Sequence, residues 1–395
     1  WWDKINTMVW TTLDSLPILP QAIDFAPKVK HYYVWASFAE RAMKDLGYNH
    51  VKTLRGSLDT SIFHRLDDTE RVKLRQKFQL SDEFIVGFVF RNQLRKSVPN
   101  LLDGFKKFKE TRPNCKLLLH THWGEGWDIP RLLEEKKIDQ SSVITTYVCN
   151  QCGNYDIRPF SGQEQNCKYC GAEKSLNTTN TAKGVTDGQL NEIYNLMDVY
   201  CHPFTSGGQE IPIQEAKLTE LITLVTNYSC GEDSCTPDSG GLSLDWSEYR
   251  EPGTQFIKAS TLSSDIATKL NRVYDMASSL KRKREKMSRQ WVIDNFSIEV
   301  IGKQLEKIID SMPEIDYNFD FNDKIEYDST YEPQGNFDSE ADFIIDLYKN
   351  ILKDKVDKNS QGVKHWINHI KNGVPAQDVV KHFQGVAQKQ INNSQ

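Results

Sequence analysis

The sequence predicts an α/β protein with two successive parallel sheets, an inserted cysteine-bearing segment and a helical C-terminal part. Three observations support this prediction. Apolar strand segments alternate with helices in residues 8–54 and again from residue 84, which is typical of parallel sheets covered by helices. Two Cys-x-x-Cys pairs interrupt the second alternation. Residues 339–387 carry apolar side chains at helical spacing.

Length and composition limit the classes of protein that are possible. The chain has 395 residues, a net charge of −5 and a mean hydropathy of −0.58. This length suggests two or three domains. The acidic charge argues against a nucleic-acid binder that relies on bulk charge. No apolar run is long enough to span a bilayer, so we expect no transmembrane segment. Eight cysteines, four of them in two close pairs, fit a reducing compartment with a metal site, so we expect a cytoplasmic protein.

The first alternation predicts a domain over residues 1–75. Its expected strands and helices are 8–12, 20–26, 31–34, 38–46 and 51–54 in chain order, followed by a charged helix at 69–78. The opening WWDKINTMVW has neither an initiator Met nor a signal-peptide pattern. We therefore expect an incomplete N-terminal domain, lacking about a hundred residues of an ordinary one.

The second alternation predicts a doubly wound nucleotide-binding domain over residues 76–312. Its expected elements are 84–90, 98–110, 116–123, 130–136, 143–148, 187–196, 199–202 and 221–226, with a long return helix at 290–310. In such a domain the ligand binds at the carboxyl ends of the strands.

The stretch 200–231 carries the first candidate site. Gly207 and Gly208 precede a helix that bears Glu215. Paired glycines let backbone N–H groups approach an anion, and a helix N-terminus favours negative charge. A carboxylate within the helix can accept hydrogen bonds from two sugar hydroxyls. These residues suggest a nucleotide with phosphate and ribose, whereas an ordinary loop and core helix is the alternative interpretation.

A basic loop carries the second candidate site. Arg91 and Lys96 follow the strand at 84–90. Arg offers a planar pair of donors and Lys a mobile point charge, and together they would offset a diphosphate. The alternative is a solvated basic loop.

Four cysteines form the third candidate site. Cys149 and Cys152 make one Cys-x-x-Cys-Gly knuckle, and Cys167 and Cys170 make the other. Two such knuckles are typical of a zinc ribbon, here expected at residues 147–180. Disulfides or redox-active pairs are the alternatives. Four thiolates close the coordination sphere, so we expect a structural zinc ion.

The donor stretch resembles the signature of glycosyltransferase family 4, retaining enzymes with the GT-B fold. In the family pattern P-S-x-x-E-G-F-G-L-P-x-x-E-A, four residues fall in register: Pro203, Pro212, Glu215 and Ala216. The family phrase G-R-x-x-x-x-K is matched by Arg91 and Lys96. The resemblance covers roughly residues 8–310 and implies a GT-B fold of two Rossmann-like domains, the first incomplete here.

The resemblance implies roles for these residues. Arg91 and Lys96 would bind the donor diphosphate and stabilise its departing charge, and Glu215 would hold the ribose. The backbone of the loop would line the phosphate and sugar side, through Gly207, Gly208, Gln209, Glu210 and Ile211. The family places its first Glu where this chain has Gly207, so Glu210 is the expected substitute and the third catalytic residue.

The expected function is therefore a retaining glycosyltransferase. It would move a sugar from a nucleotide diphosphate sugar to a hydroxyl of a glycan or glycoconjugate. Two alternatives stay open: an acceptor that is a modified base in DNA, suggested by the ribbon, and a degenerate sugar-binding scaffold without catalysis, suggested by Gly207.

The remaining features are secondary to this prediction. We expect His120 and His122 to line the cleft rather than bind a metal, and Asp198 to brace its loop. An acidic linker is expected at 313–338. Residues 339–395 resemble a small helical domain of unknown function, and seven residues carry that match: Phe343, Leu347, Tyr348, Leu352, Asp357, Gly362 and Trp366.

Overall fold

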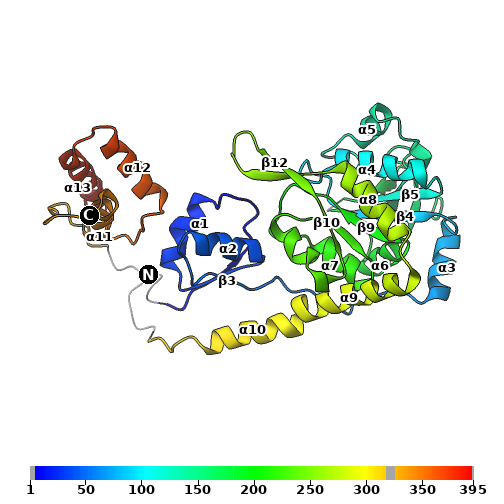
Figure 1. The fold of residues 1–395 in the computed structure, drawn as a ribbon, viewed down its shortest axis with the longest axis horizontal. Coiled ribbons are helices and arrows are strands. Elements are labelled where there is room, and N and C mark those ends of the chain that lie inside the picture. The colour runs from blue at the N-terminus through cyan, green and yellow to red at the C-terminus, as the bar shows by residue number, and fades with distance from the viewer. Residues whose placement is uncertain (1–4, 181, 317–324, 394–395) are drawn as a thin grey trace. The chain divides into compact units, whose positions relative to one another are not determined.

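A computed structural model describes residues 5–180, 182–316 and 325–393 of the chain. The chain divides into two compact units, one made of Trp1–Leu54 with Glu306–Gln395 and the other of Arg55–Leu305 (Figure 1). The acidic linker expected at 313–338 includes residues 317–324, which lie outside the described residues.

The first unit opens with a small parallel sheet. Its strands β1 (Met8–Thr11), β2 (His31–Val34) and β3 (Lys52–Thr53) lie in that order. The connecting helices are α1 (Pro20–Phe25), a 3-10 turn (Ala26–Lys28) and α2 (Ser37–Asp45). The expected βαβαβ alternation is therefore present, with ends shifted by one or two residues.

The same unit ends in three helices. They are α11 (Glu340–Asn350), α12 (Gln361–Lys371) and α13 (Ala376–Asn393). Their core consists of buried aliphatic side chains around Phe383, and Tyr348 packs against it. A Cβ at Gly362 would lie 2.3 Å from the Tyr348 hydroxyl, so glycine is required where α12 meets that ring. The helical C-terminal region is thus confirmed.

The second unit contains an eight-stranded sheet. The strand order is β11-β10-β9-β4-β5-β6-β7, and β8 pairs with β6. The bounds are β4 (Phe84–Val89), β5 (Cys115–His120), β6 (Val143–Cys149), β7 (Tyr155–Pro159), β8 (Leu176–Thr178), β9 (Val199–His202), β10 (Thr223–Thr226) and β11 (Leu242–Leu244). All pairs from β11 to β6 are parallel, whereas β7 and β8 run antiparallel to β6. The order reverses between β4 and β9, and that switch point is where a doubly wound sheet binds its ligand.

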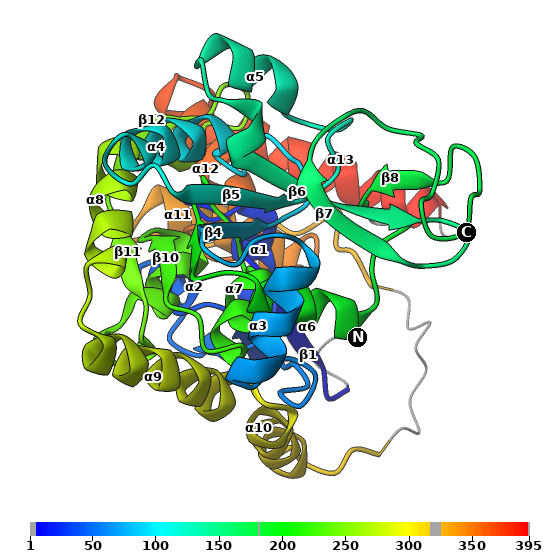
Figure 2. The same ribbon diagram turned by 90° about the vertical axis from the view of Figure 1, so that its right-hand side faces the viewer.

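Helices cover both faces of this sheet. Figure 1 shows α4 and α8 on one side and α7 and α9 on the other, and Figure 2 gives the same arrangement after a quarter turn. The bounds are α3 (Asp68–Lys77), α4 (Val98–Thr111), α5 (Ile129–Glu135), α6 (Asp187–Asn195), α7 (Ile211–Leu218), α8 (Ser263–Tyr274) and α9 (Ser278–Phe296). Gly104 lets α8 approach α4, because a Cβ there would lie 2.6 Å from the Ile266 side chain.

Several elements escaped the sequence prediction. These include α8 and the hairpin of β12 (Trp246–Arg250) and β13 (Ile257–Thr261). The prediction of a single return helix at 290–310 was wrong. Helix α9 ends at Phe296, and α10 (Ile298–Asp310) begins after a break. Ser297 is extended, pairs with Leu58 and caps α10, its hydroxyl accepting a hydrogen bond from the Val300 N–H at 3.2 Å.

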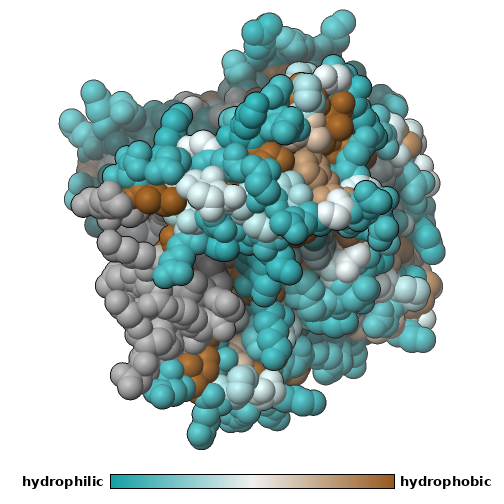
Figure 3. All heavy atoms as spheres, turned by 90° about the vertical axis from the view of Figure 1, so that its left-hand side faces the viewer, coloured by the Kyte–Doolittle hydropathy of each residue, from teal (hydrophilic) through white to brown (hydrophobic). Residues whose placement is uncertain are grey.

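The surface agrees with the low hydropathy of the chain. Figure 3 shows a face on which hydrophilic side chains predominate and apolar ones form small scattered patches. Among the described residues, the helices are either too short or too polar to span a bilayer.

Candidate functional site

A cavity of about 280 Å³ lies at the carboxyl ends of β4 and β5 in the second unit. Arg91 and Asn92 reach it from the loop after β4, and His120 and His122 from the end of β5. Glu215 of α7 completes the opposite side. The structure therefore brings two predicted site residues, Arg91 and Glu215, into one cavity at the switch point of the sheet.

The Glu215 carboxyl group is held by a tyrosine. The hydroxyl of Tyr194, on α6, donates a hydrogen bond to Glu215 Oε2 at 2.7 Å. Burial raises the pKa of Glu215 to about 6, although the Tyr194 hydrogen bond opposes this shift. Phe63 packs edge-on against Tyr194, with ring centroids 5.8 Å apart. Glu215 is thus a partly desolvated acceptor with free capacity toward the cavity.

Lys96 lies deeper than the sequence suggested. Its side chain is 3% exposed and its Nζ donates to Glu210 Oε2, whose side chain is also 3% exposed. Arg95 donates to the other oxygen of Glu210, and His202 Nε2 lies 3.1 Å from Oε2. Burial favours the neutral form of Glu210, but Lys96 and His202 together hold its pKa well below the ordinary value. Glu210 is therefore a buried carboxylate that is paired with two cations, Lys96 and Arg95.

His202 is neutral in this arrangement. Burial and the nearby Lys96 lower its pKa to about 4. The Tyr200 hydroxyl lies 2.9 Å from His202 Nδ1 and also donates to the carbonyl oxygen of Val89 at 3.0 Å. With its proton on Nε2 the neutral ring donates to Glu210, and its Nδ1 is then an acceptor that shares the single Tyr200 hydroxyl proton with the Val89 carbonyl oxygen.

Part of the glycine loop already makes hydrogen bonds within the protein. The Gly207 N–H donates to Ser229 Oγ at 3.0 Å. It is therefore not free for a ligand, contrary to the prediction from the sequence. Within the described chain, the N–H groups of Gly208 and Gln209 donate no hydrogen bond to another backbone group. Ile211 is exposed where α7 begins. A Cβ at Gly207 would lie 2.8 Å from Glu210 Oε1, so the Glu210 carboxylate occupies the space into which a longer residue 207 would project.

Arg91 and Asn92 have different tasks. The Arg91 side chain is 58% exposed, and its Nε lies 3.9 Å from a carboxylate oxygen of Glu125. Asn92 is buried and shapes the loop before α5, because its amide donates to the Trp127 carbonyl at 2.9 Å and accepts from the Trp127 N–H at 3.0 Å. Arg91 is therefore the cation of the cavity that can rearrange around a ligand.

The histidines and Asp198 lie where the sequence placed them. His120 and His122 both line the cavity, and burial lowers the pKa of His120 to about 4. Asp198 accepts two hydrogen bonds from Arg75 at 3.1 Å and one from the Ile85 N–H at 2.8 Å. It therefore braces the start of β4 away from the cavity.

The four cysteines converge. The Sγ atoms of Cys149, Cys152, Cys167 and Cys170, hereafter the four-cysteine cluster, lie within 4.8 Å of one another. The Cys149–Cys170 and Cys152–Cys167 sulfur pairs are 3.7 and 3.8 Å apart. These separations exceed a disulfide bond of about 2.05 Å. They agree with the about 3.8 Å edge of a tetrahedron with Zn–S bonds of about 2.3 Å. The residues fit a closed metal site.

Sequence reasoning missed three contributors to the site. Arg95 had no assigned role, yet it contacts Glu210. Tyr194 and His202 lie on α6 and β9, and only their spatial partners reveal their use. The signal for His202 was its place at the end of a buried strand, directly before the loop that carries Glu210.

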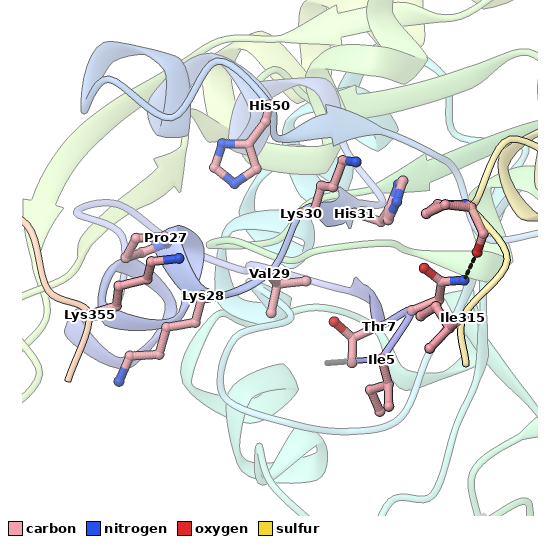
Figure 4. A pocket seen from close by; sticks show the side chains of 12 residues that line it. Ile5, Thr7, Pro27, Lys28, Val29, Lys30, His31, His50, Ile315 and Lys355 are labelled. Atoms are coloured by element: carbon pink, nitrogen blue, oxygen red, sulfur yellow. Dashed lines mark hydrogen bonds between the residues drawn. The ribbon is translucent and has the colours of Figure 1, made fainter. Parts of the chain in front are cut away.

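A second cavity lies in the first unit. It measures about 530 Å³ and is bordered by three lysines and two histidines: Lys28, Lys30, Lys355, His31 and His50 (Figure 4). Lys28 is paired with Asp354 at 3.0 Å, and His50 Nε2 contacts the Ala26 carbonyl at 2.9 Å. None of the predicted donor-site residues reaches this cavity.

Comparison with solved structures identifies the fold. The chain superposes on the Anabaena protein HepE in complex with UDP-glucose with a TM-score of 0.55 and 13% identity, over 77% of this chain and 72% of that one. A glycosyltransferase from Rickettsia africae gives 0.51 and 13%, over 71% and 62%. Sucrose-phosphate synthase from Thermosynechococcus elongatus gives 0.50 and 15%, over 72% and 59%. The chain thus spans less than two thirds of the last two enzymes.

These similarities confirm the predicted α/β, GT-B fold class. At 13–15% identity they establish the fold alone. No protein-family model and no curated protein matches the sequence.

Proposed function

We propose that the protein is a glycosyltransferase that moves a sugar from a nucleotide diphosphate sugar to an acceptor hydroxyl. The observation that carries this proposal is the shared cavity of Arg91 and Glu215 at the β4–β9 switch point. The fold similarity to HepE, which was solved with UDP-glucose, supports a nucleotide sugar as the ligand class.

Each residue has a defined task in this proposal. Glu215 accepts hydrogen bonds from the ribose hydroxyls, and Arg91 binds the diphosphate from the open side of the cavity. Lys96 comes from the same loop as Arg91 but does not line the cavity, so it contributes positive charge from behind the cavity wall, where Glu210 holds it together with Arg95. Both cations stabilise the negative charge that builds on the departing diphosphate, and such electrostatic stabilisation usually contributes most to the rate of a transfer of this kind.

Glu210 keeps two donors in place, the buried Lys96 and the partly exposed Arg95. It neutralises Lys96 and Arg95 before the donor arrives, and its carboxylate lies against Gly207. This supports Glu210 as the substitute for the acid that the family carries at position 207. Retention of the anomeric configuration and a glycan or glycoconjugate acceptor follow from the resemblance to family 4.

The four-cysteine cluster would hold zinc as a structural ion. Its four sulfur atoms would fill the coordination sphere of a tetrahedral ion and leave no position for a substrate. Zinc would stabilise the fold of the ribbon and supply no chemistry to the transfer.

Calorimetry with UDP, ADP and GDP tests the donor site. One of them should bind, and Arg91→Ala should weaken that binding by about 1.5 kcal/mol, the lower end for charged hydrogen bonds, because Arg91 is largely exposed. Arg131→Ala is the matched control, since Arg131 is 73% exposed and pairs with Glu135 of its own helix. Equal affinity in both variants would remove the donor-site assignment.

Catalysis needs its own measurement. The matching nucleotide sugar should be hydrolysed slowly without acceptor, and NMR of the released sugar should show retained configuration. Tight nucleotide binding without hydrolysis or transfer would mean a sugar-binding scaffold rather than an enzyme.

A further inference from the structure

The segment that carries the four-cysteine cluster shares a strand with the donor sheet. β6 pairs with β5 through Leu117–Leu119, and its far end pairs with β7 and β8. Cys149, the first cysteine of the cluster, is the last residue of β6 and pairs with Leu176 of β8. All seven residues of β6 are buried. Figure 2 shows β6 running from the sheet into this segment. The cluster is therefore continuous with the sheet that forms the cavity.

The residues that follow β8 form one wall of the cavity. Thr179, Asn180, Gly184 and Val185 all line it, on the chain directly after β8. β8 has only three residues, and the first of them, Leu176, pairs with Cys149 of the four-cysteine cluster. The position of this wall therefore depends on how firmly β8 is held.

A hydrogen-bonded tether joins β8 to the loop after β5. Thr178 Oγ1 accepts hydrogen bonds from Gln163 Nε2 at 2.6 Å and from the Trp123 N–H at 3.2 Å. Trp123 stacks on Phe160 at 4.4 Å and donates from its indole to Thr145 at 2.9 Å. His122 and Glu125, beside Trp123, line the cavity. The tether thus fixes a second part of the cavity.

A further tether reaches α6. Gln189 Nε2 donates to the carbonyl oxygen of Gly153, in the first knuckle, at 3.0 Å. The Tyr155 hydroxyl, on β7, donates to Glu192. The same helix presents Leu190 to the cavity and Tyr194 to Glu215. Three sides of the cavity are therefore connected to one small segment.

That segment cannot hold itself together by apolar packing. Its separate core consists of four buried residues with Phe160 beside them: Tyr147, Cys149, Cys167 and Leu176. Two of these four are members of the four-cysteine cluster. A core of this size needs a metal or disulfides to be stable, and none of the four cysteines forms a disulfide in the structure.

We propose that metal binding by the four-cysteine cluster positions the nucleoside end of the donor cavity, and so controls affinity for a nucleoside diphosphate. The identity of that ligand rests on the proposed function. Without the metal, β8 loses its anchor, and the Trp123 loop and the wall residues Thr179, Asn180, Gly184 and Val185 lose their fixed positions. Lys96 and Glu210 lie on other loops and stay paired with each other.

The test compares two cysteine variants of the full chain. Cys170→Ser should lose zinc by elemental analysis and bind the best of UDP, ADP and GDP about tenfold more weakly, as expected when positioning hydrogen bonds are lost. Cys170→His should keep a zinc site of three cysteines and one histidine, with near wild-type affinity. Cys235→Ser, a free cysteine outside the cluster, is the matched control and should change neither property.

A third variant separates the tether from the metal. Thr178→Val removes the hydroxyl that joins Gln163 and Trp123, so it should keep zinc but weaken nucleotide binding several-fold. Wild-type affinity in zinc-free Cys170→Ser, or an absence of metal from the wild type, would overturn the inference.

Hydrogen exchange makes the test independent of the ligand. Residues 182–190 should exchange faster in Cys170→Ser than in the wild type, whereas β4 should be unchanged. Unchanged exchange at 182–190 would overturn this inference. A wild type that binds none of the three nucleotides would instead overturn the proposed function.

Discussion

The buried pair of Lys96 and Glu210 can be measured with a double-mutant cycle. Lys96→Met keeps the length of the side chain and removes its charge, and Glu210→Gln removes the opposite charge. Glu210 keeps Arg95 and His202 in the first variant, so we expect a loss of about 1.5–3 kcal/mol of unfolding free energy. Glu210→Gln leaves a nearly buried ammonium without a counter-charge, and should cost about 3–5 kcal/mol.

The double variant should cost less than the sum of the two single losses. With both charges gone, neither is left buried alone, and a coupling energy of about 2–3 kcal/mol is expected. Urea unfolding at pH 7.5, with similar slopes for all four proteins, gives the required values. The exposed pair of Arg131 and Glu135 is the control cycle and should couple by only about 0.3–0.5 kcal/mol.

The pH dependence provides a second check of the same pair. The pKa of Glu210 is lower in the folded state than in the unfolded state. The stabilisation by Glu210 is therefore complete above the unfolded pKa and decreases on acidification.

One outcome of the double-mutant cycle would refute the reasoning. If the stability losses of Lys96→Met and Glu210→Gln add within about 0.5 kcal/mol, the two residues behave as independent sites.

Two further variants test the neighbouring residues. Because burial raises the pKa of Glu215 to about 6, its carboxylate becomes the dominant form only above that pH, so nucleotide affinity should rise between pH 5 and 7.5. Glu215→Gln should flatten that rise and weaken binding at pH 7.5 by about 1.5–3 kcal/mol. Calorimetry should show a smaller loss with a 2′,3′-dideoxy nucleotide, and equal losses would mean that Glu215 does not touch the ribose. Gly207→Ala should lower stability by about 1–3 kcal/mol in thermal unfolding, since its Cβ would displace the Glu210 carboxylate, whereas Gly302→Ala, in open space on α10, should not. Equal stability of these two alanine variants would contradict the crowding at Gly207.

The fold was predictable where the sequence carries a strong local pattern. The apolar run of β4 and the paired knuckles around β6 have few alternative interpretations. The break at Ser297 was missed because apolar residues continue at helical spacing on both sides of it. The available signal was a serine able to cap α10, which competes with helix continuation.

The candidate site was predictable in part for a different reason. Arg91 and Glu215 are recognisable from spacing, and the structure places both in one cavity. The partnership of Lys96 with Glu210 joins two loops that lie 114 residues apart in the chain, so no local pattern contains it. Burial then decides which positive charge is mobile: Arg91 stays exposed, and Lys96 is fixed.

The complete burial of β6 has a consequence for aggregation of the protein in a cell. β7 and β8 are the covering on one side of a strand that reads VITTYVC, apolar or β-branched at nearly every position. An uncovered strand of that composition is a template for pairing with other chains. If zinc holds this covering closed, then zinc supply during synthesis decides how much of the protein aggregates, before any question of catalysis arises.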